Sequence, residues 1–167
     1  PSSIIDRPLE ILSVGPKLDI ALGGGVPEGS LFIMTGPEKV GKTVTALTFC
    51  ANAQKHYARK IYYANIEGRL KKRDLEGIID LSLDPEKMQI IGSTEGNILS
   101  AEKYLSIVDN IVHTQPGSLA VVDSFSALSS EAELTGDLSD MQVMSVQKIL
   151  AKFCRRISNV LPINRVT

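Results

Sequence analysis

The residues best suited to chemistry lie in a glycine-rich segment, Gly36 to Thr43, that fits the pattern G-x-x-x-x-G-K-[ST]. Glycines at this spacing let backbone amides wrap a phosphate chain, and the amides that open the next helix (residues 42–44) add a positive dipole end. Lys42 would reach the β- and γ-phosphates, and the Thr43 hydroxyl would bind Mg²⁺. A glycine-rich turn with an exposed lysine is the alternative. We predict a nucleoside triphosphate site made by Gly36, Pro37, Glu38, Lys39, Val40, Gly41, Lys42, Thr43 and Val44.

Two carboxylates could complete this chemistry. Asp123 closes the apolar run 119–122, where an acid can hold the Mg²⁺ shell, although a turn residue or helix cap is the alternative. Glu67 follows the run 61–65 and would lie at the same carboxyl edge of a parallel sheet, where it could orient and deprotonate the water that attacks the γ-phosphate. The alternative for Glu67 is a loop acid beside the basic residues Arg69, Lys71, Lys72 and Arg73.

The elements that must position these residues alternate along the chain. Short apolar runs predict strands at 31–35, 61–64, 88–91 and 119–122, the first of them buried on both faces, and Val166-Thr167 resembles the start of another strand. Periodic patterns predict helices at 42–57, 75–83, 98–112 (capped by Asn97) and 146–157, with a loop at 129–140. This alternation predicts an α/β fold, a parallel sheet with helices on both faces.

Composition limits the classes of protein that this chain can belong to. Its 167 residues, 43% hydrophobic and 22% charged, suit a single soluble domain, and no run of 18 apolar residues predicts a membrane span. The net charge of −1 and the pI near 6.2 exclude nucleic-acid binding by bulk charge, so any such binding must be local. We expect Cys50 and Cys154 to be reduced thiols within helices.

Three segments resemble the ATPase core of RecA recombinases, including phage relatives of the UvsX type. Residues 18–29 (LDIALGGGVPEG) resemble the stretch that leads into its phosphate-binding loop, residues 118–128 (SLAVVDSFSAL) its Walker-B strand, and residues 131–140 (EAELTGDLSD) its first DNA-binding loop. The resemblance spans roughly residues 9–160. It implies a RecA-like P-loop NTPase core. We interpret residues 1–167 as one truncated core, and we expect the second DNA loop and the phosphate sensor beyond Thr167. We expect the protein in the cytoplasm of a bacterium, or of the host if a phage encodes it.

The resemblance also assigns roles to individual residues. Glu67 falls where the family has its catalytic glutamate, but Asn65 replaces the usual acid and residues 68–74 lack an aromatic side chain to stack on adenine. Gly136 would offer backbone amides to single-stranded DNA, Val143 would wedge between bases, and Lys148 would contact a phosphate. Each of these roles has an alternative without DNA. Residues 129–141 contain four acids and no basic residue, so they could form a solvated acidic loop. Val143 could be a core residue, and Lys148 a solvated residue on a helix.

The function that the resemblance implies is ATP-dependent homologous recombination. Such a protein binds single-stranded DNA as a self-assembled filament and is a DNA-dependent ATPase that uses Mg²⁺, here with Lys42 and Glu67 as its catalytic residues. One alternative is another RecA-fold ATPase, either a hexameric helicase core or a KaiC-like regulator, and the loop at 129–141 favours recombination over it. The other is a non-hydrolysing paralogue, which the set Lys42, Thr43, Glu67 and Asp123 disfavours.

Overall fold

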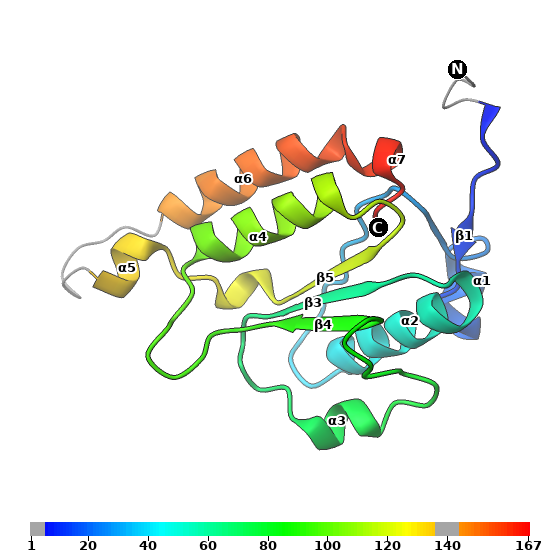
Figure 1. Cartoon of the computed structure of the whole chain (residues 1–167), viewed down its shortest axis with the longest axis horizontal. Helices are drawn as coiled ribbons and strands as arrows, with labels where there is room; N and C mark the ends of the chain where they lie inside the picture. The colour runs from blue at the N-terminus through cyan, green and yellow to red at the C-terminus, as the bar shows by residue number, and fades with distance from the viewer. Residues whose placement is uncertain (1–5, 136–143) are drawn as a thin grey trace.

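The computed structural model describes residues 6–135 and 144–167, and a parallel three-stranded sheet lies at its centre (Figure 1). The strand order is β4-β3-β5, and Ile61 pairs with Met88 on one side and with Leu119 on the other. All three strands were predicted. A separate antiparallel pair, β1 and β2, was not. The strands are β1 (Ile11–Leu12), β2 (Val26–Pro27), β3 (Ile61–Asn65), β4 (Met88–Ile91) and β5 (Leu119–Asp123).

Helices cover both faces of the central sheet, which confirms the predicted α/β class (Figure 1). Side chains alternate between the two faces of a strand, so odd- and even-numbered residues of β3 and β5 enter different cores. The odd face, which includes Ile61, Tyr63 and Leu119, packs with Leu47 and Cys50 of α2. The even face packs with α4, α6 and α7 through Ala64, Ala120, Val122, Tyr104, Leu105, Phe153 and Leu161. These helices are α2 (Lys42–Tyr57), α4 (Ala101–Thr114), α6 (Met144–Ser158) and α7 (Leu161–Asn164).

Several predicted boundaries were wrong. The helix expected at 75–83 is α3 (Lys72–Glu76), and it ends at Gly77, which lacks the side chain to continue it favourably. The loop expected at 129–140 contains a short helix, α5 (Glu131–Thr135). Two further short helices are α1 (Pro16–Ala21) and η2 (Phe125–Ala127).

The cap of α4 was also placed wrongly. Asn97 forms an isolated bridge with Thr94, and Ile98 is two-thirds exposed, so neither belongs to the helix. The cap is Ser100, a buried residue whose hydroxyl accepts a hydrogen bond from the amide of Lys103 at 3.4 Å. Asparagine and serine are both good N-cap residues. Ser100 is the cap because it is buried together with the start of α4.

The strand expected at 31–35 does not form. Leu31 is 41% exposed and Ile33 is 59% exposed, although the sequence predicts burial on both faces. The outer edge of β5 pairs instead with the end of the chain: the Ala120 amide donates to the Thr167 carbonyl at 2.8 Å, and the Thr167 amide donates to the Ser118 carbonyl at 3.2 Å. A cavity of about 570 Å³ separates the segment from β5. The apolar run therefore has no strand to pair with among the described residues.

A buried ionic cluster anchors the base of this segment. The Arg59 guanidinium donates to the carboxylates of Glu28 and Glu10, and Arg165 Nε donates to Glu28 Oε1 at 2.8 Å. Burial disfavours the charged form of Glu28, but the hydrogen bonds from Arg165 and Arg59 outweigh it and hold the pKa of Glu28 below its usual range. Next to this cluster, Gly29 approaches Pro162 so closely that a Cβ would lie 2.7 Å from the Pro162 Cα. The cluster thus fixes where residues 30–36 leave the body of the fold.

Both cysteines are free thiols, as predicted, and they lie on opposite faces of the sheet, in α2 and α6. Within the described parts of the chain, no helix has the length and apolar character needed to cross a membrane.

Candidate active site

The carboxyl edge of the sheet brings Glu67 and Asp123 together. Asp123 is the last residue of β5 and pairs in register with Asn65, the last residue of β3. Beyond the strand ends, the amides of Ile66 and Glu67 both donate to the Asp123 carbonyl, at 2.9 and 3.4 Å. These backbone bonds extend the β3–β5 pairing and fix Glu67 beside Asp123, as the sequence predicts for parallel strands.

The start of α2 brings Thr43 to the same place. Gly41 is the N-cap of α2 with a φ of 93°, a conformation that a residue with a side chain rarely adopts, and no side chain caps the helix. Thr43 follows two residues later, and its hydroxyl donates to Asp123 Oδ2 at 2.9 Å. The uncapped first turn of α2 therefore faces the acidic edge of the sheet with its free amides, which suits an anion.

Lys42 folds back over the glycine-rich loop, residues 36–43. Its Nζ donates to the carbonyls of Gly36 and Pro37, at 2.8 and 2.6 Å. Lys39, in the same loop, has a φ of 61°. The ammonium therefore lies within the loop, where it could exchange its carbonyl partners for phosphate oxygens.

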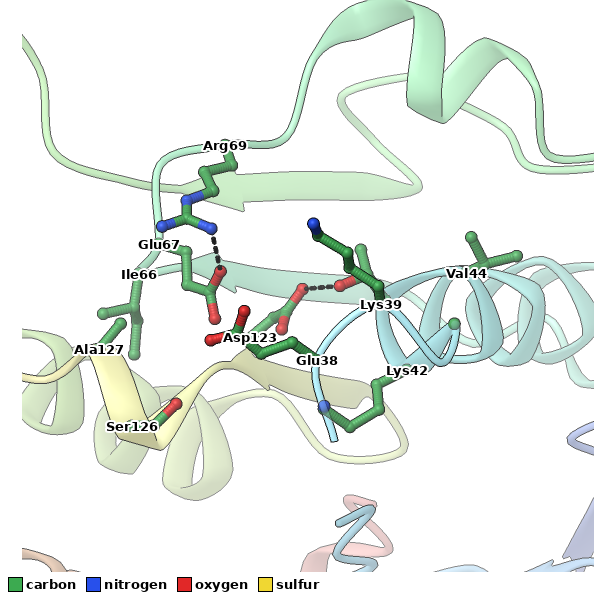
Figure 2. Close-up of a pocket in the computed structure, with 12 residues that line it drawn as sticks. Glu38, Lys39, Lys42, Val44, Ile66, Glu67, Arg69, Asp123, Ser126 and Ala127 are labelled. Carbon is green, nitrogen blue, oxygen red and sulfur yellow. Dashed lines mark hydrogen bonds and ion pairs between the residues drawn. The ribbon is translucent and has the colours of Figure 1, made fainter. Parts of the chain in front are cut away.

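One pocket is lined by Lys42, Thr43, Glu67 and Asp123 together (Figure 2). Its volume of about 810 Å³ lies within the range of about 300–1,000 Å³ common for small-molecule sites. Figure 2 shows the carboxylates of Glu38, Glu67 and Asp123 pointing into the same space, with the glycine-rich loop beside them. The pocket is lined by Glu38, Lys39, Gly41, Lys42, Thr43, Val44, Ile66, Glu67, Arg69, Asp123, Ser126 and Ala127.

Ser124 holds the Glu67 carboxylate and is itself bonded to a second serine, Ser126. The Ser124 hydroxyl donates to Glu67 Oε1 at 2.8 Å and lies 2.7 Å from the Ser126 hydroxyl. Arg69 approaches the other oxygen, Oε2, at 4.0 Å, a contact that Figure 2 marks with a dashed line. The sequence analysis did not single out either serine, although both lie within three residues of Asp123. Glu67 is thus oriented by its neighbours while its carboxylate stays partly exposed to the pocket.

Tyr63 makes a contact with Asp123 that the sequence analysis also missed. Its ring is fully buried, and its hydroxyl donates to Asp123 Oδ2 at 2.6 Å. Burial, followed by the bond to Asp123, raises the pKa of Tyr63 far above its usual value, so the phenol keeps its proton and acts as a donor. The alternation of side chains along β3 does indicate the side of the sheet: Tyr63 is odd-numbered, like the residues of β3 and β5 that face α2.

The donor set fits a magnesium ion that is shared with a nucleotide. In residues 6–135 and 144–167, no group of three or more His, Cys, Asp or Glu side chains is placed to hold a metal. The Thr43 hydroxyl and the Asp123 carboxylate do offer oxygens next to each other. Mg²⁺ prefers few protein oxygens and takes its other ligands from phosphates and water. The residues present are therefore sufficient for Mg²⁺ bound together with a triphosphate.

The structure brings together only part of the predicted set. Glu67, Lys42, Thr43 and Asp123 surround one pocket, along with Glu38, Lys39 and Gly41 of the glycine-rich loop and Val44 of α2, whereas the lining of this pocket does not include the predicted residues Gly36, Pro37 and Val40. Among the predicted DNA-binding residues, Lys148 is exposed on α6, whereas Gly136 and Val143 lie outside the described residues.

Comparisons with known proteins identify the family of this chain. A family model, the RecA N-terminal domain, matches residues 5–167. Protein RecA of Streptomyces venezuelae is 34% identical over 168 residues, which is 96% of this chain and 41% of that protein. Protein RecA of Streptomyces coelicolor is 32% identical over 97% of this chain and 41% of its own length, and that of Rippkaea orientalis is 33% identical over 90% and 41%. The chain thus spans about two fifths of the length of these relatives. It belongs to the RecA family.

Proposed function

We propose that this chain is the ATP-binding and ATP-hydrolysing part of a recombination protein that assembles on single-stranded DNA. The observation that carries the proposal is the meeting of Lys42, Thr43, Glu67 and Asp123 around one pocket at the carboxyl edge of the sheet. The names of the relatives support the recombination role, since each is called Protein RecA.

Each of the four residues has a distinct role in the proposed reaction. Lys42 leaves the carbonyls of Gly36 and Pro37 and binds the β- and γ-phosphate oxygens, while the first amides of α2 bind the phosphate chain. Thr43 and Asp123 hold Mg²⁺, which when bound neutralises charge that develops on the phosphates. Glu67, held by Ser124, orients the attacking water and accepts its proton.

Single-stranded DNA is the proposed polymeric partner, with a further copy of the protein as the partner in a filament. Lys148 is free to reach a phosphate from the exposed surface of α6. Gly136 and Val143 stay proposals from the sequence, as backbone donor and base wedge. The chain from Asp123 to α5 is short, so a change at the Mg²⁺ site can be transmitted to the DNA loop.

The experiment measures ATP hydrolysis by the intact protein with and without a poly-dT strand, and poly-dT binding with and without a non-hydrolysable ATP analogue. We expect DNA to stimulate hydrolysis and the analogue to tighten DNA binding. Because coupling between two binding sites is reciprocal, DNA should then tighten binding of the analogue by the same factor. An equal rate of hydrolysis with and without poly-dT would favour a helicase-type or KaiC-like ATPase. Nucleotide binding with no hydrolysis in either condition would favour the non-hydrolysing paralogue.

A further inference from the structure

The Asp123 carboxylate is held by two hydroxyls from different elements. Thr43 of α2 and Tyr63 of β3 both donate to Oδ2, at 2.9 and 2.6 Å. A carboxylate oxygen has about two lone-pair sites, so two donors fill Oδ2. Oδ1 is then the oxygen of Asp123 that can face a metal and its water shell.

The two donors differ in what else they must do. The Thr43 hydroxyl lies at the opening of α2, where the proposed site uses it as a metal ligand. Tyr63 has no such second task, because its ring lies in the core of the odd face with Leu47 and Cys50 and has 0% exposure. A phenol fixed in a close-packed core holds its hydroxyl at one position.

We infer that Tyr63 is a positioning residue for magnesium: it fixes the Asp123 carboxylate so that Oδ1 faces the metal shell when nucleotide binds. This inference rests on the proposed function. The phenol touches neither metal nor nucleotide and acts only through Asp123. A donor that bonds to a ligating carboxylate, without touching the metal, sets the orientation of that carboxylate, and its removal weakens metal binding.

The neighbouring tyrosine provides a matched control. Tyr62 is also buried, at 5% exposure, and its hydroxyl donates to Gln115 Oε1 at 2.8 Å. It belongs to the same strand but faces the opposite side of the sheet, away from Asp123. Tyr62→Phe and Tyr63→Phe therefore each remove one buried, hydrogen-bonded hydroxyl from β3, and only the second removes it from Asp123.

The test uses the intact protein and a fluorescent non-hydrolysable ATP analogue, titrated in chelator and at rising Mg²⁺. In chelator we expect the wild type and both variants to bind the analogue equally. The Mg²⁺ concentration that gives half of the tightening should rise about tenfold in Tyr63→Phe and stay within about twofold of wild type in Tyr62→Phe. A merely structural role of Tyr63 would lower the thermal midpoint and leave this Mg²⁺ midpoint unchanged.

Two outcomes would overturn the inference: an unchanged Mg²⁺ midpoint in folded Tyr63→Phe, or an equal shift in both variants. If Tyr63→Phe does not fold, a variant that carries Tyr57→Phe, Tyr62→Phe and Tyr104→Phe decides, because Tyr63 is its one remaining tyrosine. Adding Mg²⁺ to the nucleotide complex of this variant must perturb the near-ultraviolet tyrosine band, and no perturbation rejects the inference. Failure of the wild type to bind the analogue in any condition would instead refute the proposed nucleotide site itself.

Discussion

The two sides of the candidate active site are held in different ways. On the acidic side, Glu67 and Asp123 follow two paired strands, and backbone hydrogen bonds continue between them past the strand ends. On the phosphate side, the glycine-rich loop follows residues 31–35, which pair with no strand among the described residues and expose much of their apolar surface. The loop is positioned from its other end, by α2 and the bond from Thr43 to Asp123.

This difference indicates which part of the proposed reaction each side of the site supports. The acidic side is preorganised by the sheet, which suits residues that must hold a water and a metal at fixed positions. The phosphate side lacks this support along residues 31–35 and is held through α2 and the bond from Thr43 to Asp123. Substitutions on the phosphate side should therefore weaken nucleotide binding, whereas removing the Glu67 carboxylate on the acidic side should slow the chemical step and leave binding nearly unchanged.

The largest effect is expected for Lys42→Ala. Removing the ammonium removes the main positive charge at the phosphates, so we expect Mg-ATP binding to weaken by about 10- to 100-fold and hydrolysis to be lost. Calorimetry with a non-hydrolysable analogue and a phosphate-release assay measure the two effects. Lys55→Ala, further along α2 in an exposed ion pair with Asp80, is the control. Unchanged turnover in Lys42→Ala would refute the role of the loop.

Glu67→Gln tests the acidic side. The amide keeps the shape of the side chain but cannot accept the proton of the attacking water, so hydrolysis should slow by about 10²-fold or more with nearly unchanged ATP affinity. Single-turnover kinetics separate the two. Glu76→Gln on the exposed surface of α3 should leave both unchanged. If Glu67→Gln abolished binding and kept the rate per bound ATP, Glu67 would have a structural role only.

A pair of stability variants sharpens the comparison of the two sides. Leu119 in β5 is 2% exposed, so Leu119→Ala should lower the free energy of unfolding by about 2–5 kcal/mol through lost burial and a cavity. Ile33, in the unpaired segment, is 59% exposed, and Ile33→Ala should cost under about 1 kcal/mol. Urea unfolding of the intact protein measures both. Equal losses would mean that residues 31–35 are packed as tightly as the sheet.

The anchor of the phosphate side should respond to acid. Because its pKa in the fold lies below the usual 4.5, Glu28 stabilises the folded state at pH above 4.5, and this stabilisation is lost as pH falls through the lowered value. Glu28→Gln should therefore be less stable than wild type at pH 7, and the difference should shrink below pH 4.5. Urea unfolding across this range measures it, and a difference independent of pH would contradict the charge pairing.

The smallest effect is expected at the surface. Lys148→Ala should reduce the slope of log affinity against log salt for single-stranded DNA by about one unit, the share of one phosphate contact. Fluorescence anisotropy on poly-dT at several salt concentrations measures the slope. Lys87→Ala, exposed next to β4, should leave it unchanged, and an equal slope in all three proteins would remove Lys148 from the interface.

Much of the fold follows from local sequence pattern, and the failures have identifiable causes. The strands β3, β4 and β5 were predicted because apolar runs between turn residues suit a buried parallel strand. Residues 31–35 carry the same pattern, but a strand also needs a neighbour, which local sequence does not show. The proximity of Glu67 to Asp123 followed from parallel topology. The contact from Tyr63 was missed, because its odd parity places the ring on the α2 face of the sheet but no motif marks a core phenol as the partner of an acid.

The contacts of Lys42 have a consequence for the kinetics of nucleotide capture. Its ammonium keeps its charge but already donates hydrogen bonds to the carbonyls of Gly36 and Pro37, so a triphosphate entering the proposed site would have to displace these two partners. Association then becomes a substitution reaction, in which two short hydrogen bonds break as the phosphate bonds form. The barrier to that exchange slows nucleotide association and, by the same path, nucleotide release. The Lys42 ammonium therefore has hydrogen-bond partners in both positions: the loop carbonyls without nucleotide and the phosphate oxygens with it.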